Sequence, residues 1–171
     1  MQNHYELFHL PQQFGIDAVA LDQAYREVQG QVHPDKFVNG SDAEKRVAMQ
    51  WATRANEAYQ TLRNPLKRAT YLCELNGIDL QVESNTAMPV TFLMQQMEWR
   101  EALDEVRAGR NLGALERLDV EVRHAWNEQV EQIAGLLDDS AFAAASQAVR
   151  ELMFLDKFRA EIADHYEVLE Q

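Results

Sequence analysis

Apolar residues recur every three or four positions through most of this chain of 171 residues, and this spacing is the strongest constraint on its fold. Residues at this spacing line one face of an α-helix. Alternation of the kind found in strands never extends beyond a few residues. The pattern therefore predicts an all-α protein.

Helix start and stop signals predict a hairpin of two helices in the N-terminal part of the chain. Asp17 is a natural N-cap for the first helix, and Pro34 should end that helix near residue 32 or 33. Ser41 or Asp42 gives the second helix a capped start. The apolar repeats of the two helices are Ala18, Leu21, Tyr25, Val28 and Val32, then Val47, Trp51, Ala52, Ala55, Ala58, Tyr59 and Leu62.

A short helix should follow the hairpin and end the first domain. Asn64 can cap it, and Pro65 suits its first position, where the missing N–H is not needed. Asn76 and Gly77 form a stop signal. The next segment has no clear period before Pro89, so we expect a first domain at 1–76 and a linker at 77–88.

Three further amphipathic stretches, at about 89–108, 111–136 and 140–169, predict a second domain at 89–171. Connections this short make consecutive helices antiparallel neighbours, which predicts a three-helix bundle. Its second and third helices should bury Leu115, Leu118, Val122, Val130, Ile133 and Leu137, and Phe142, Ala145, Val149, Leu152, Leu155, Ile162, Tyr166 and Leu169.

The connection inside the hairpin contains the polar tripeptide His33-Pro34-Asp35. Pro34 fixes its own φ angle, so the imidazole and the carboxylate should project from a stiffened corner. Three interpretations are open: a surface displayed to a partner, a simple turn that Asp35 caps, or an acid–base pair of an enzyme. An enzyme would also need a convergent pocket with oxyanion donors, of which the segment gives no sign.

Charge and cysteine content exclude several classes of protein. The chain has 28 acidic and 16 basic side chains and a net charge of −12, so nucleic acid and anionic membranes are unlikely partners. No apolar run is long enough to span a bilayer, and the N-terminus has no signal-peptide order, so a cytoplasmic protein is expected. Cys73 is alone, which excludes an intrachain disulfide and metal sites of paired cysteines, and it should be buried. We expect no cofactor and no metal.

The first helix of the predicted bundle has two apolar stripes where a bundle needs one. One stripe consists of Phe92, Trp99, Leu103 and Val106. The other consists of Val90, Leu93, Met94 and Met97, bordered by Glu98, Arg100, Glu101 and Asp104. Phe154 similarly lies opposite the core residues of its own helix. The second stripe is expected either to contact the N-terminal domain or to be exposed for a partner.

These motifs resemble a known family of proteins. HPDKF between two amphipathic helices, with NEAYQTL on the second, resembles the J domain of DnaJ-type co-chaperones. FLMQQMEWREALDE and FLDKFR narrow the resemblance to the HscB family of bacterial iron–sulfur cluster assembly, over essentially the whole chain. The resemblance implies a J domain that docks on HscA, a DnaK-type ATPase, and a bundle that binds the cluster scaffold IscU.

Matching positions assign residues to each expected interface. The contact with an HscA-like ATPase would consist of His33, Pro34 and Asp35, with Arg26 and Lys36 adding positive charge. The contact with an IscU-like scaffold would consist of Leu93, Met94, Met97, Glu98, Arg100, Glu101 and Phe154.

The chain departs from the J-domain pattern at two positions. Val32 stands where an aromatic residue commonly precedes the histidine, and Gly30 occupies a helical position that often carries a basic residue. Both departures argue against tight binding to a generic DnaK. A general J-domain co-chaperone for another DnaK-type partner remains an alternative, as does a helical scaffold that dimerises through its patch.

Overall fold

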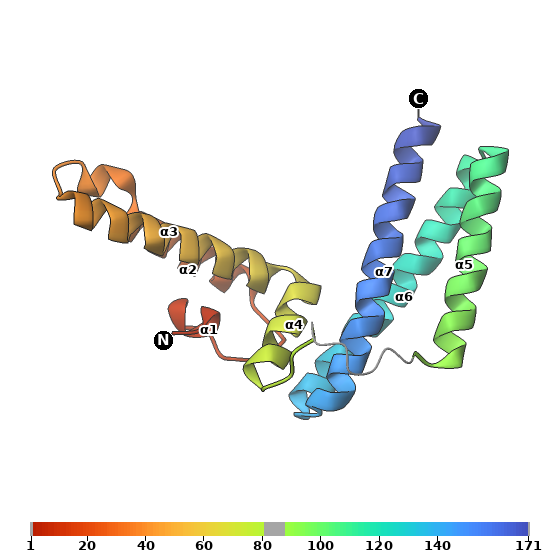
Figure 1. Cartoon of the computed structure of the whole chain (residues 1–171), viewed down its shortest axis with the longest axis horizontal. Helices are drawn as coiled ribbons and strands as arrows, with labels where there is room; N and C mark the ends of the chain where they lie inside the picture. The colour runs from red at the N-terminus through yellow and green to blue at the C-terminus, as the bar shows by residue number, and fades with distance from the viewer. Residues whose placement is uncertain (1, 81–87, 171) are drawn as a thin grey trace. The chain divides into compact units, whose positions relative to one another are not determined.

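The computed structural model describes residues 2–80 and 88–170, and nearly all of them are helical or in short turns (Figure 1). No strand occurs in these two ranges, as predicted. Contacts divide the chain into two compact units, Met1–Asn76 and Gly77–Gln171. Much of the predicted linker, at 81–87, lies outside the described residues.

The first unit is a hairpin of α2 (Ala18–Val32) and α3 (Asp42–Arg63), joined through η1, one turn of 3-10 helix (Pro34–Phe37). The helices α1 (His4–Leu7) and α4 (Pro65–Leu75) both contact α3. In Figure 1 α2 lies largely behind α3, and the two helices contact each other. The connection therefore lies at one end of the hairpin.

Local side chains fix the helix boundaries of this unit. The Asp17 carboxylate accepts the N–H groups of residues 19 and 20, at 3.0 and 3.2 Å. Ser41 Oγ accepts the N–H of Glu44 at 3.1 Å, and Asn64 Oδ1 that of Lys67 at 3.0 Å. These contacts confirm the predicted caps and resolve the open choice between Ser41 and Asp42 in favour of Ser41. Gly77 has φ 85°, the left-handed conformation that follows a helix end.

Aromatic and polar contacts join α2 to α3. The rings of Tyr25 and Tyr59 stack with centroids 4.2 Å apart, and the Tyr59 hydroxyl donates to Asp22 at 2.7 Å.

The prediction that Val47, Trp51 and Ala52 extend the buried face was wrong, because all three are exposed. Near the loop α3 contacts α2 and the short η1, and of residues 42–54 only Ala48 is buried. Cys73 is buried, as predicted.

The second unit is a bundle of α5 (Val90–Gly109), α6 (Leu112–Asp138) and α7 (Phe142–Leu169). All three pairs of helices contact each other. Because the connections are short, α5 and α7 run parallel to each other and antiparallel to α6 (Figure 1). The structure thus confirms the predicted bundle, with α6 extending two residues beyond the expected end.

The predicted apolar repeats form the core of the bundle. Leu115, Val122 and Ile133 of α6 are fully buried, as are Val149, Leu152 and Ile162 of α7. The Trp99 ring of α5 stacks on Phe158 of α7, with centroids 6.0 Å apart. Four predicted core residues at the margins are only half-buried: Val130, Phe142, Tyr166 and Leu169.

Candidate partner-binding sites

The His33-Pro34-Asp35 corner is built by its own backbone. α2 ends at Val32, and His33 leaves the helical region with ψ 136°, as expected for a residue before proline. Pro34 then begins the 3-10 turn. His33 Nδ1 accepts the N–H of Asp35 at 3.2 Å, so the turn is capped by the imidazole and not by the Asp35 carboxylate.

That hydrogen bond determines which nitrogen of the His33 ring can donate to a partner. Since Nδ1 is an acceptor, the neutral imidazole carries its proton on Nε2, which can donate to a partner. The side chains of His33 and Asp35 are 58% and 87% exposed, and Nδ1 lies 3.5 Å from the nearer carboxylate oxygen. A water-exposed carboxylate next to an occupied Nδ1 is suited to contact with a partner and poorly suited to proton transfer.

The two predicted basic residues lie on different elements. Arg26 is exposed on α2, seven residues before His33 and therefore about 10 Å away along the helix. Lys36 is exposed within the 3-10 turn itself. Both therefore leave their charge available next to the corner in a chain that is otherwise acidic.

An apolar hollow next to the corner was not predicted. It has a volume of about 460 Å³, and its lining includes Val32, Pro34, Phe37, Val38 and Met49. Val38 and Met49 are exposed although they are apolar. Neither residue belongs to the apolar repeats that form the buried face of the hairpin. Apolar residues outside those repeats were the feature of the sequence that could have indicated this hollow.

The second apolar stripe of α5 is exposed. Leu93, Met94 and Met97 are 48%, 56% and 64% exposed, whereas Trp99 and Leu103 of the other stripe are buried. α5 therefore has two faces, as the sequence predicted. Packing within the bundle uses only one of them.

Phe154 of α7 joins this surface through a contact that the sequence did not reveal. It is 48% exposed, and its ring meets Phe92 edge to face with centroids 6.3 Å apart. Phe92, predicted to belong to the core stripe, is only half-buried. It links the two stripes. We use the term α5 patch for Leu93, Met94, Met97 and Phe154.

The three predicted rim charges differ in their contacts. Glu98 and Glu101 are exposed on α5. Arg100 forms an ion pair with Glu161 of α7, and its guanidinium lies over the Phe158 ring, 5.2 Å from the centroid. Arg100 thus borders the patch and also connects α5 to α7.

Two other features, a metal site and a membrane-spanning helix, are absent from the described residues. In the ranges 2–80 and 88–170, no three His, Cys, Asp or Glu side chains are grouped so that they could hold a metal ion. Over the same ranges, no helix has the length and apolarity required to cross a membrane.

Comparison with known proteins matches both units. The DnaJ domain family matches residues 3–71, and the family described as the HSCB C-terminal oligomerisation domain matches residues 88–163. A co-chaperone protein HscB homolog of Burkholderia multivorans is 55% identical over 168 residues, which are 98% of this chain and 96% of that protein. The chain belongs to the HscB family of co-chaperones.

Solved structures of HscB proteins agree. The chaperone HscB from Vibrio cholerae has a TM-score of 0.86 at 36% identity, over 98% of this chain and 99% of that one. The human co-chaperone protein HscB has a TM-score of 0.89 at 26% identity, over 95% and 81%. The first unit is therefore a J domain and the second an HscB C-terminal domain. The corner and the α5 patch fall within the two matched ranges.

Proposed function

We propose that this HscB-family co-chaperone binds an IscU-like iron–sulfur scaffold through the α5 patch. It delivers the scaffold to an HscA-like DnaK-type ATPase and stimulates that ATPase through the His33-Pro34-Asp35 corner. The observation that carries the proposal is the exposure of the α5 patch, because a bundle helix has no internal use for a second apolar face.

The patch has the composition of a protein-binding surface. Fully burying a side chain such as Leu, Met or Phe stabilises a complex by about 1.5–3 kcal/mol relative to leaving it exposed. The four members are each about half exposed, so together they offer several kcal/mol to a partner that covers them. Met94 and Met97 adapt to the shape of that partner because the thioether chain is flexible. Glu98 and Glu101 at the edge orient the encounter.

The corner supports an allosteric role rather than a chemical one. The Asp35 carboxylate matches the fork of an arginine on the ATPase, since the two groups form paired charge-assisted hydrogen bonds. His33 Nε2 offers a further donor, and Pro34 limits the conformations that must be ordered on binding. Such contacts raise the rate of hydrolysis if they are stronger in the hydrolysis-competent state of the ATPase.

Covalent connection of the two units makes delivery efficient. Once the corner binds the ATPase, a scaffold held on the bundle is confined near that ATPase at an effective concentration that the linkage sets. Each contact can then be individually weak. This is the property expected of a co-chaperone that must release both partners in every cycle.

Purified components test the proposal against its alternatives. Single-turnover ATP hydrolysis should be stimulated more for an HscA-type ATPase than for a general DnaK, and saturable binding to an IscU-type scaffold should appear in calorimetry. Equal stimulation of both ATPases without scaffold binding would support a general J-domain co-chaperone instead. Sedimentation at several concentrations checks the third alternative, in which the patch pairs two copies of the chain.

A further inference from the structure

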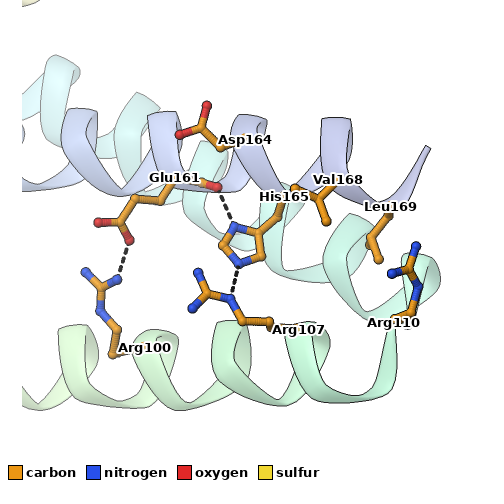
Figure 2. A pocket seen from close by; sticks show the side chains of 8 residues that line it. All are labelled: Arg100, Arg107, Arg110, Glu161, Asp164, His165, Val168 and Leu169. Atoms are coloured by element: carbon orange, nitrogen blue, oxygen red, sulfur yellow. Dashed lines mark hydrogen bonds and ion pairs between the residues drawn. The ribbon is translucent and has the colours of Figure 1, made fainter. Parts of the chain in front are cut away.

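Three arginines gather at a hollow between α5 and α7, beyond the α5 patch. The hollow has a volume of about 370 Å³. Figure 2 shows its lining, which consists of Arg100, Arg107, Arg110, Glu161, Asp164, His165, Val168 and Leu169. Such a concentration of arginine is unusual in a chain with a net charge of −12. Of these residues, the sequence analysis had named only Arg100, as a rim charge, and Leu169, as a core residue.

His165 holds Arg107 in place. His165 Nδ1 lies 2.7 Å from the carbonyl oxygen of Glu161, so Nδ1 must carry a proton and donate it. Nε2 of the neutral ring is then an acceptor, and it receives the Nε–H of Arg107 at 3.1 Å. Both contacts are visible in Figure 2. The terminal nitrogens of Arg107 have no protein partner among the described residues and are available to a ligand.

The positive charge at the hollow is only partly neutralised. Arg100 is paired with Glu161. The Asp164 carboxylate points away from the arginines in Figure 2, and Arg110 forms no ion pair within the described ranges. Asp104, on α5 between Arg100 and Arg107, does not line the hollow. Arg107 and Arg110 therefore leave a local surplus of positive charge.

The hollow continues the α5 patch along the same helix. Met97, Arg100 and Arg107 are separated by three and seven residues, spacings that keep them near one face of α5. Arg100 borders the patch and lines the hollow. From Arg100 to Arg107 is about 10 Å along the helix. A protein seated on the patch needs only a short further segment to reach Arg107.

We propose that Arg107 and Arg110 bind an acidic side chain of the same protein that occupies the α5 patch. This inference rests on the proposed function and names the chemistry of its partner: an apolar surface flanked by a carboxylate-bearing segment. A guanidinium pairs with a carboxylate through two parallel hydrogen bonds, and His165 has already ordered one guanidinium of the site. Val168 and Leu169 give the hollow an apolar margin that strengthens such a pair by excluding water.

Affinity for a purified IscU-type scaffold tests this inference with the full chain. The double variant Arg107→Gln with Arg110→Gln should bind about tenfold more weakly at low salt and show a shallower salt dependence. The control variant, Arg117→Gln with Arg123→Gln, makes the same change of charge on α6 and should bind like the wild type. Arg107→Lys with Arg110→Lys, which keeps the charges but loses the fork, should fall between the two.

Each outcome has a separate meaning. If Leu93→Ala with Met97→Ala weakens binding while the Arg107 and Arg110 variants match the α6 control in affinity and salt dependence, the inference is wrong and the proposed function stands. If the wild type does not bind the scaffold, both fail. Circular dichroism melts identify any variant that has lost its fold. If the glutamine variant has lost its fold, the scaffold affinity of the lysine variant tests the inference in its place.

Discussion

The His33-Pro34-Asp35 corner and the α5 patch present opposite chemistry on two separate units of the chain. The corner is polar, exposed and shaped by one proline and one hydrogen bond from the Asp35 N–H to the His33 ring. The patch is apolar and shaped by helix periodicity, with charges only at its rim. The corner can therefore form directional contacts between charged groups, whereas the α5 patch can bury apolar surface area.

This difference matches two different tasks. Directional contacts between charged groups discriminate between states of a partner, because a small displacement removes them. Apolar area holds a partner through many states, because it depends little on orientation. A surface that must sense and bias an ATPase cycle is expected to be of the first kind. A surface that must retain a cargo during that cycle is expected to be of the second.

The largest effect should follow from removing the apolar area. Replacing Leu93, Met97 and Phe154 together by alanine should weaken scaffold binding more than about a hundredfold, since each truncation removes on the order of 1 kcal/mol or more of burial. The melting temperature should hardly change, because truncation of exposed groups creates no cavity. Calorimetry and thermal melts measure the two quantities.

Leu115→Ala is the matched control for that variant. Leu115 is fully buried in the same bundle, so its truncation should cost about 2–5 kcal/mol and lower the melting temperature clearly. If the triple variant melts like this control, the second stripe is a covered face, such as a contact with the J domain. If it melts and binds like the wild type, the scaffold site lies elsewhere.

Removing the charge of the corner should have the next largest effect. Asp35→Asn keeps the shape but loses a charge-assisted contact worth about 2 kcal/mol or more, so stimulation of the ATPase should fall more than tenfold. Asp42→Asn makes the same change at an exposed position nearby and should leave stimulation intact. Stimulation by the Asp35 variant within a factor of about two of wild type would refute the arginine contact.

Salt should affect the two surfaces unequally. Raising the salt concentration from low to physiological should slow association with the scaffold but reduce its affinity less than about tenfold, because rim charges act mainly on encounter. Stimulation of the ATPase should weaken more. Stopped-flow association rates and calorimetry separate the two effects. A loss of scaffold affinity by orders of magnitude would show that charge and not apolar area holds the scaffold.

The smallest expected effect is a difference in pH response between the two units. Burial between Tyr71 and its neighbours lowers the pKa of His4 in the J domain below its ordinary value of 6.5. The unfolded state then binds more protons, so the J domain loses stability as pH falls below 6.5. Burial raises the pKa of Glu151 in the bundle above 4.5, so the bundle gains stability as pH falls through that raised pKa towards 4.5.

Hydrogen exchange, which reports each unit separately, measures these opposite trends. His4→Phe keeps the stacking on Tyr71 and should remove part of the acid sensitivity of the J domain. Glu151→Gln should remove part of the gain in the bundle. Variants that leave the pH dependence of both units unchanged would show that neither group contributes.

Locally encoded features were predictable from the sequence, and contacts between distant segments were not. Asp17 and Asn64 act on residues two or three positions away, so the helix starts could be read directly. The exposed face of α5 followed from periodicity within one helix. The Phe92–Phe154 contact depends instead on the register in which α5 packs on α7, which no local pattern specifies.

The Arg107–His165 pair shows the same limit more clearly. The two residues are 58 positions apart, and neither belongs to a recognisable motif. The error at Val47 and Trp51 has a related cause. Their spacing fits a buried face, but burial also requires a neighbouring element, and the elements that contact this end of α3, the end of α2 and the short η1, leave both residues exposed.

The most direct test of the account measures each variant in the assay for the other surface. The scaffold affinity of Asp35→Asn and the ATPase stimulation by the triple patch variant, without scaffold present, should both equal those of the wild type. Independent surfaces on separate units predict this result. Loss of scaffold binding in the Asp35 variant, or loss of scaffold-free stimulation in a patch variant that is still folded, would contradict the assignment of one partner to each surface.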